Sequence, residues 1–131
     1  MAQVISIHSF RGGTGKSNIT ANLASLLAAR GLRVGVVDTD IQSPGIHILF
    51  GLAGAAVEHT LNDYLWGRVG IEQAAIDVTA RVDASLAGRI FLIALSIKSG
   101  EIARVLREGY DARTLTSGLR QLARANKPFH A

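Results

Sequence analysis

A short segment near the N-terminus combines residue types that bind phosphate. Residues 12–17 read GGTGKS and lie between an apolar run rich in β-branched residues and a stretch with helical periodicity. Glycines allow successive backbone N–H groups to face phosphate oxygens, and a helix that begins at Lys16 adds its positive dipole end. In such a loop the lysine contacts the β and γ phosphates and the Ser17 hydroxyl binds Mg²⁺. The segment predicts a site for nucleotide phosphates.

The segment departs from the strict phosphate-loop pattern G-x-x-x-x-G-K-[ST] at one position. Phe10 stands where that pattern has its first glycine. The remaining glycines, the lysine and the serine would still occur together in this register by chance only on the order of a few times per million positions. We therefore keep the phosphate-loop interpretation.

A dinucleotide-binding loop is the nearest alternative. A Gly-x-Gly pair follows the first apolar run, and Asp38 ends the second one, as in half of a Rossmann fingerprint. The third glycine of that fingerprint is missing, because Asn18 occupies its place, and a Rossmann loop does not use the adjacent Lys16 and Ser17. The sequence favours the phosphate loop.

The elements around the loop form a strand, a helix and a second strand. Residues 4–10 read as a buried strand, residues 16–30 carry an apolar stripe at helical spacing that includes Ile19 and Leu26, and Gly31 stops that helix. Residues 34–37 form the next apolar run. A βαβ unit gives a parallel sheet with a right-handed crossover, and its ligands bind at the carboxyl ends of the strands.

Later segments alternate irregular stretches, helices and one further strand. Residues 39–59 read as irregular, Thr60 and Asp63 as a capping box that opens a helix through Trp66, and residues 71–75 as another short helix. Residues 90–95 predict a third buried strand. Ser99 is the expected cap of the next helix, and a last helix is expected from residue 113 to about 125.

Two motifs together resemble the deviant Walker-A ATPases of the MinD and ParA type. Residues 11–17 read RGGTGKS, similar to that family's K-G-G-x-G-K-[ST], and residues 38–42 read DTDIQ, similar to its switch I motif D-x-D-x-Q. The resemblance extends to about residue 124 and is nearest to the MinD-like branch. It implies an α/β fold: a three-layer αβα P-loop NTPase with a mostly parallel sheet.

The resemblance also implies roles for individual residues. Asp40 would orient or activate the water that attacks the γ-phosphate, and Asp38 would hold the magnesium shell through water, together with Ser17. Arg11 stands where the family has a lysine that reaches across a nucleotide-sandwich dimer. The expected catalytic residues are Asp40, Lys16 and Arg11. The expected nucleotide-binding residues are Gly12, Gly13, Thr14, Gly15, Lys16, Ser17 and Asn18.

As a protein of this kind, the chain would bind ATP and Mg²⁺ and act as a nucleotide-dependent dimerisation switch. The family implies a homodimer across the nucleotide, a regulatory partner, and a role in intracellular positioning, cell division or partitioning. The Walker-B strand expected of such an ATPase does not occur after residue 95. We therefore expect residues 1–131 to form one partial P-loop ATPase domain, truncated after the third strand region and poorly active alone.

Charge suggests a second function of another class. The second half of the chain carries the entire basic excess that gives the net charge of +4. Arg113, Arg120, Arg124 and Lys127 fall on one side of the last expected helix, with leucines opposite. The alternative is a non-catalytic basic module that contacts an anionic membrane or a nucleic acid through this helix.

The amino-acid composition excludes several other classes of protein and of functional site. The chain has no cysteine, which excludes disulfides, thiol catalysis, zinc ribbons and cysteine-ligated clusters within it. The four histidines show no ligand spacing, so we expect no histidine metal site. No basic N-terminal region precedes an apolar run, and no long apolar stretch occurs, so the expected location is cytoplasmic.

Overall fold

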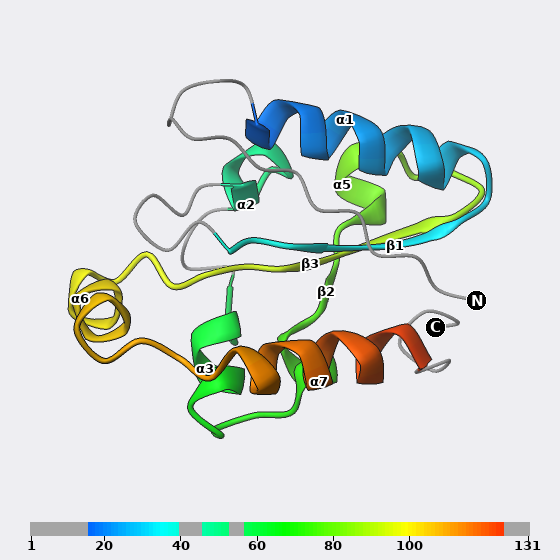
Figure 1. Cartoon of the computed structure of the whole chain (residues 1–131). Coiled ribbons are helices and arrows are strands. Elements are labelled where there is room, and N and C mark those ends of the chain that lie inside the picture. The colour runs from blue at the N-terminus through cyan, green and yellow to red at the C-terminus, as the bar shows by residue number, and fades with distance from the viewer. Residues whose placement is uncertain (1–15, 40–45, 53–56, 125–131) are drawn as a thin grey trace.

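The computed structural model describes residues 16–39, 46–52 and 57–124 (Figure 1). The expected first strand, residues 11–15 of the loop, Asp40 and Lys127 lie outside the described residues. The described elements, in chain order, are α1 (Lys16–Ala29), β1 (Arg33–Val37), α2 (Ile46–Leu49), α3 (Leu61–Leu65), α4 (Ile71–Ala74), β2 (Ile76–Asp77), α5 (Thr79–Asp83), β3 (Arg89–Ile93), α6 (Ser99–Glu108) and α7 (Ala112–Arg124).

The described sheet has the strand order β1-β3-β2. β1 and β3 run parallel, with Val34 opposite Ile90 and Val36 opposite Leu92, which confirms the two strands expected there. β2 pairs antiparallel with β3 and was not expected, because two residues are too few to show a periodicity. The sheet is therefore mixed, and β3 lies at its centre.

Helices cover both faces of this sheet (Figure 1). α1, α2 and α5 lie on one face, α3 and α7 lie on the other, and α6 lies beyond the carboxyl end of β3. α4 packs on the same face as α3 and α7, because Ile71 and Ala74 belong to the second cluster of buried residues. Side chains of β3 alternate between the faces: Ile90 and Leu92 join the first cluster of buried residues, and Phe91 and Ile93 join the second. The expected three-layer αβα architecture is confirmed.

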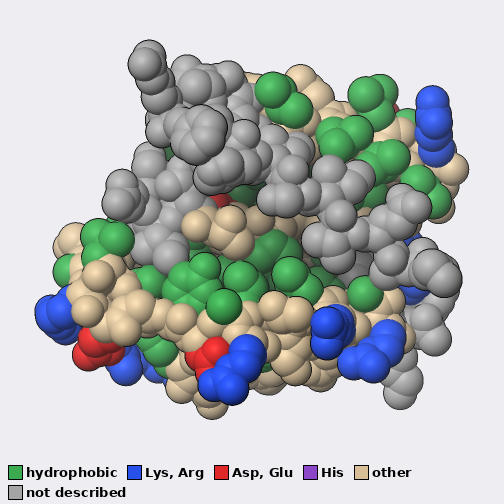
Figure 2. Space-filling model, in the orientation of Figure 1, with side chains coloured by type: hydrophobic (Ala, Val, Ile, Leu, Met, Phe, Trp, Pro, Cys, Tyr) green, Lys and Arg blue, Asp and Glu red, His purple; other side chains and the backbone are tan. Residues whose placement is uncertain are grey.

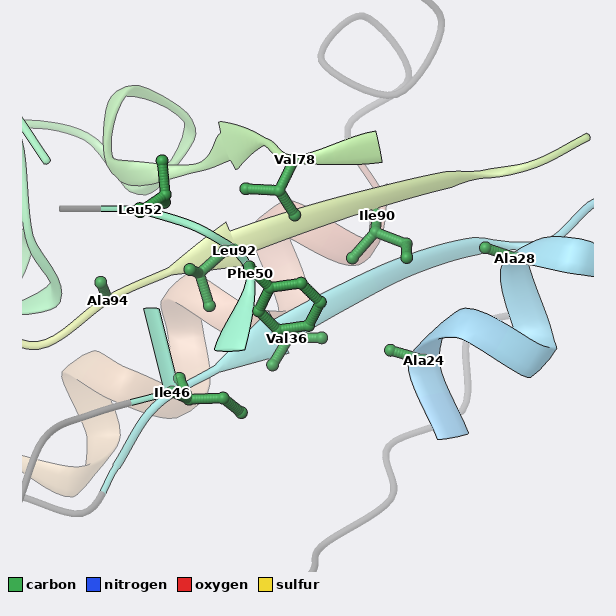
Figure 3. Close-up of a cluster of buried hydrophobic side chains, with 10 residues drawn as sticks. All are labelled: Ala24, Ala28, Val36, Ile46, Phe50, Leu52, Val78, Ile90, Leu92 and Ala94. Atoms are coloured by element: carbon green, nitrogen blue, oxygen red, sulfur yellow. The ribbon is translucent and has the colours of Figure 1, made fainter. Parts of the chain in front are cut away.

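The first buried cluster lies between the sheet and α1 (Figure 3). α1 contributes Ala24 and Ala28, which are 3% and 0% exposed, whereas Ile19 and Leu26 are 56% and 65% exposed. The helix was expected correctly, but its leucine-rich stripe is not the side that packs on the sheet. Alanines at that interface let the helix axis approach the strands closely.

The ends of the helices agree with the expected signals in most cases. Gly31 follows α1 with φ +89° and donates its N–H to the Ala28 carbonyl, so the helix stops where expected. Thr60 and Asp63 form both hydrogen bonds of the expected capping box at α3, at 3.0 and 3.2 Å. Ser99 is not a cap, however. The N-cap of α6 is Lys98, which makes no side-chain capping bond.

The segment expected to be irregular, residues 39–59, contains the one-turn helix α2 in its described part. Ile46 and Phe50 of this region are buried in the first cluster, so their apolar side chains hold α2 against the sheet (Figure 3). The expected helix at residues 71–75 is α4, and the expected last helix is α7, which begins one residue early.

Candidate phosphate-binding edge and adjoining cleft

The expected phosphate and magnesium residues converge on one edge of the fold, as far as the structure describes them. α1 begins at Lys16 and connects through Gly31 to the start of β1, so its N-terminus and the carboxyl end of β1 lie at the same edge (Figure 1). Asn18, in the first turn of α1, is exposed. This is the edge at which an α/β sheet binds its ligands.

Asp38 is the expected magnesium residue that the structure describes in full. It follows β1 directly, is 7% exposed, and its backbone N–H donates to the Ile93 carbonyl at 3.0 Å. That hydrogen bond continues the parallel pairing of β1 and β3 by one residue and fixes the direction in which the chain leaves the sheet. A carboxylate buried at this edge needs a cation or hydrogen-bond donors near it.

A cleft of about 370 Å³ opens at the carboxyl end of β3. It was not foreseen from the sequence, because its walls come from segments that lie far apart in the chain. Its lining residues are His47, Val57, Glu58, His59, Thr60, Asp63, Arg68, Val69, Leu95, Ser96, Ile97, Lys98 and Glu101. The cleft is thus bounded by α2, the start of α3, the turn after β3 and the first turn of α6.

A chain of ion pairs and hydrogen bonds holds one wall of this cleft. Arg68 pairs with Asp63 at 3.0 Å and with Glu101 at 3.1 Å, and Ser96 Oγ donates to Glu101 Oε1 at 2.5 Å. The Ser96 N–H donates to the buried side chain of Asn62 at 2.8 Å. These contacts connect α3, the turn after β3 and α6, so the wall is rigidly positioned.

The Asp63 carboxyl group has a lowered pKa. Its burial alone would raise the pKa, but the hydrogen bonds from the Thr60 N–H and the Arg68 guanidinium, together with the charge of Arg68, outweigh that effect. The same pairs with Asp63 and Glu101 raise the pKa of Arg68. At neutral pH the Asp63 carboxylate and the Arg68 guanidinium are therefore both charged.

Trp66 lies next to this wall and contacts two arginines. The guanidinium of Arg104 lies 4.2 Å and that of Arg68 lies 5.0 Å from the ring centroid. Trp66 follows α3 directly, and its cation–π contact with Arg104 links the end of α3 to α6.

The outer side of α7 is a shallow basic groove. It is lined by Ala112, Arg113, Thr116, Ser117, Arg120 and Arg124. Basic side chains gather over α6 and α7 along the lower rim of the molecule, with hydrophobic side chains above them (Figure 2). Leu122 is buried in the second cluster and Leu115 packs against it, so the leucine side of α7 is part of the core.

No helix among the described residues is long and apolar enough to cross a membrane. In the same part of the chain, no three His, Asp or Glu side chains are arranged to hold a metal ion.

Comparison with known families identifies the class. A family model described as "ParA: NUBPL iron-transfer P-loop NTPase" matches residues 1–82. This chain belongs to the ParA family of P-loop NTPases. The match includes both motifs that suggested the resemblance, and it confirms that interpretation.

Curated relatives come from more than one branch of the ParA family. An uncharacterized ATP-binding protein of Methanocaldococcus jannaschii is 47% identical over 74 residues, 56% of this chain and 27% of the relative. The cytosolic Fe-S cluster assembly factor cfd1 of Emericella nidulans is 38% identical over 84 residues, which are 64% of this chain and 25% of the relative. A putative septum site-determining protein MinD of Guillardia theta is 38% identical over 76 residues, which are 58% of this chain and 28% of the relative.

The chain spans about a quarter of the length of these relatives. The match places it in the ParA family and does not single out the MinD-like branch, since the relatives also include an iron–sulfur assembly factor.

A solved structure supports the fold. Cobyrinic acid a,c-diamide synthase of Mycobacterium smegmatis, whose crystal contains an ATP analog and magnesium, has a TM-score of 0.68. The two chains are 22% identical, and the similarity covers 88% of this chain and 44% of the synthase. At this identity the similarity establishes the shared α/β fold.

Proposed function

We propose that residues 1–131 supply the phosphate-binding and switch I part of a Mg²⁺-dependent ATPase that works as a nucleotide-dependent switch. The observation that carries the proposal is the position of Asp38. It is buried at the carboxyl end of β1, at the edge where α1 begins directly after the sequence GGTG. A positive helix end and a buried carboxylate at one edge suit a phosphate group with its counter-cation.

The side chains assigned to this edge offer the chemical groups that bind magnesium and ATP. Oxygen ligands are those that Mg²⁺ prefers, and the Asp38 carboxylate and the Ser17 hydroxyl are such groups. When bound, the ion offsets phosphate charge. Lys16 would hold the β and γ phosphates, and Asp40 would orient the attacking water. The nucleotide-binding segment would be residues 12–18.

Arg11 would act between subunits of a homodimer. A guanidinium keeps the positive charge of the family's lysine and offers two parallel donors to phosphate oxygens. In a full-length relative carrying arginine here, we expect Arg11→Ala to weaken ATP-dependent dimerisation more than ADP binding. Equal losses in sedimentation experiments with each nucleotide would instead assign Arg11 to its own subunit's loop.

The names of the relatives suggest two processes for such a switch: septum-site determination and iron–sulfur cluster assembly. These 131 residues contain no cysteine, so they offer no thiolate to a cluster. If the switch serves iron–sulfur transfer, the cluster ligands come from outside these residues. We therefore propose the ATP-driven switch itself as the function of this chain, with positioning, division and partitioning as the processes suggested by its MinD-like features.

Calorimetric titration with a non-hydrolysable ATP analogue and Mg²⁺ tests the phosphate loop. We expect Lys16→Ala to lose at least about a hundredfold in affinity, because it removes a charge from the phosphates. Arg124→Ala is the matched control, since it removes one positive charge from the exposed side of α7. In a full-length relative, Asp40→Ala should retain binding and lose hydrolysis. Unchanged affinity in Lys16→Ala would refute the assignment.

The basic groove of α7 supports a second candidate function, contact with a polyanion. The buried leucine side of α7 excludes the insertion of that side into a membrane without unfolding of the core. A purely electrostatic contact would weaken steeply with salt. Binding of DNA or anionic vesicles without nucleotide, lost in the Arg120→Ala/Arg124→Ala variant, would support this candidate.

A further inference from the structure

The short helix α2 has apolar side chains on two sides. Ile46 and the adjoining Phe50 are buried in the first cluster, whereas Ile48 and Leu49 are 68% and 44% exposed. A helix that is apolar all round is ordinarily buried on all sides, because aliphatic surface in contact with water is unfavourable. Ile48 and Leu49 therefore form an apolar surface that the described part of the chain leaves uncovered.

A third exposed aliphatic side chain lies at the same edge of the fold. Ile97, in the turn after β3, is 49% exposed and lines the cleft at the carboxyl end of β3 together with His47 of α2. α2 also contacts α1 and lies beside its first turns (Figure 1). The exposed side chains of α2 and the turn after β3 thus border the edge at which we propose that the nucleotide binds.

The charges at this edge suit a partner that carries the same surface. Asp63 and Glu101 already pair with Arg68. Glu58 and Lys98 are exposed and line the same cleft, and neither side chain forms an ion pair with another described residue. In a two-fold symmetric contact, each copy can place its acid opposite the base of the other, so both charges are paired twice. A partner of one charge sign would instead repel one of them.

We propose that Ile48, Leu49 and Ile97 form the apolar part of a contact with a second copy of this chain, made when Mg²⁺ and ATP occupy the phosphate-binding edge. This contact depends on the proposed function, because the nucleotide must be bound at that edge. The Arg11 contact proposed above supplies charge between the subunits. The three aliphatic side chains supply the apolar area that the centre of a protein–protein interface requires.

The rate of thiol alkylation tests this contact, because the chain has no cysteine and a single introduced thiol is unique. Ile48→Cys and Leu26→Cys form a matched pair, since the parent side chains are 68% and 65% exposed but lie on α2 and on the third turn of α1. With Mg²⁺ and a non-hydrolysable ATP analogue, alkylation of Ile48→Cys by a maleimide should slow by about fivefold or more as the chain concentration rises. Alkylation of Leu26→Cys should change less than about twofold.

Sedimentation equilibrium provides a second measurement, with Ile48→Lys and Leu26→Lys as the matched variants. A lysine at the centre of an apolar contact must lose water on association, so Ile48→Lys should weaken analogue-dependent dimerisation by about tenfold or more. Leu26→Lys introduces the same charge on α1 and should change it by less than about twofold. Calorimetry with ADP should give the parent affinity in both variants, since neither residue belongs to the proposed nucleotide site.

The possible failures are distinguishable. If the parent does not bind the analogue in calorimetry, the proposed function is refuted and this contact with it. If the parent binds the analogue but stays monomeric, or if the two lysine variants weaken dimerisation equally, the contact alone is refuted. Slower alkylation of Ile48→Cys that does not depend on chain concentration would also overturn it, because a segment of the same chain would then cover α2.

Discussion

Gly118 of α7 lies against the ring of Tyr64 of α3 so closely that a Cβ atom there would come within 2.6 Å of the Tyr64 hydroxyl oxygen. The same hydroxyl donates to the Thr114 carbonyl, one turn earlier on α7, at 2.8 Å. A glycine inside a helix ordinarily weakens it. In the structure it is the position that lets α3 and α7 approach each other.

Gly118→Ala should therefore destabilise the protein by about 1–2 kcal/mol. Overpacking costs roughly 1–3 kcal/mol, which exceeds the roughly 1 kcal/mol that alanine gains over glycine in a helix. Urea denaturation measures the change. Gly100→Ala in α6 is the control, since a Cβ there meets nothing within 4 Å, and it should stabilise by about 0.5–1 kcal/mol. Equal effects of the two substitutions would contradict this account of the contact.

Gly88→Ala should be more damaging. A Cβ at Gly88 would lie 2.1 Å from the Leu32 carbonyl oxygen and 2.8 Å from that of Ala28, and backbone atoms cannot rotate away. We expect a loss of about 3 kcal/mol or more, because the contacts between the end of α1 and the start of β3 must open.

Gly35→Ala is the comparison variant for Gly88, because a Cβ at Gly35 makes an ordinary 3.5 Å contact with Leu122. Its stability should stay within about 0.5 kcal/mol of the parent. Thermal melts of the two variants side by side provide the measurement, and a mild effect at Gly88 would show that the α1–β3 junction is loosely packed.

Asp63 should make stability dependent on pH in the acid range. Its pKa in the folded protein is lowered from the ordinary value of 3.8, so the unfolded state binds more protons between the two values. This contribution is fully present above the unfolded pKa and is lost as the pH falls through the folded pKa. Asp63→Asn should cost about 1 kcal/mol at pH 7, through the loss of the cap and the Arg68 pair.

The difference between the parent and Asp63→Asn should shrink as the pH falls below about 4. Glu72→Gln in α4 is the control, because its exposed side chain forms no ion pair in the described part of the chain. Denaturant midpoints at a series of pH values measure both. A difference that persists unchanged at pH 2 would assign the effect to packing and not to charge.

Arg104→Ala should alter the fluorescence of Trp66, the one tryptophan of the chain. Removal of the guanidinium 4.2 Å from its ring exposes the indole to water and should shift the emission to longer wavelength. The expected loss of stability is about 0.5–1 kcal/mol. Arg107→Ala, on the same helix, should leave the emission unchanged. An unchanged spectrum in Arg104→Ala would show that the arginine does not cover the ring in solution.

Local signals in the sequence predicted local structure well. The capping box of Thr60 and Asp63 depends on residues three apart, and both of its hydrogen bonds are present. The β3 strand was predicted because a fully buried strand has an apolar run with no polar residue. The family and the αβα layers followed from the motifs at residues 11–17 and 38–42.

Features that depend on distant contacts could not be predicted. Nothing in the sequence around Asn62 indicates that its side chain is buried and accepts the Ser96 N–H. The apolar stripe of α1 gave the helix but not its buried side, because the close approach of the sheet selects Ala24 and Ala28 over larger residues. The cleft with His47 and Lys98 requires the tertiary arrangement of several segments. The proposed roles of residues 11–18, Asp38 and Asp40 remain predictions.

The alternation of β3 side chains between the two buried clusters has a consequence for cooperativity. β3 contributes fully buried residues to both clusters: Ile90 and Leu92 to the one beneath α1, Phe91 and Ile93 to the one beneath α3 and α7. Neither cluster can melt without removing half of the packing of that strand. The β3 amides should therefore exchange with solvent hydrogen only through global opening, and a ligand that tightens either face would slow exchange on both.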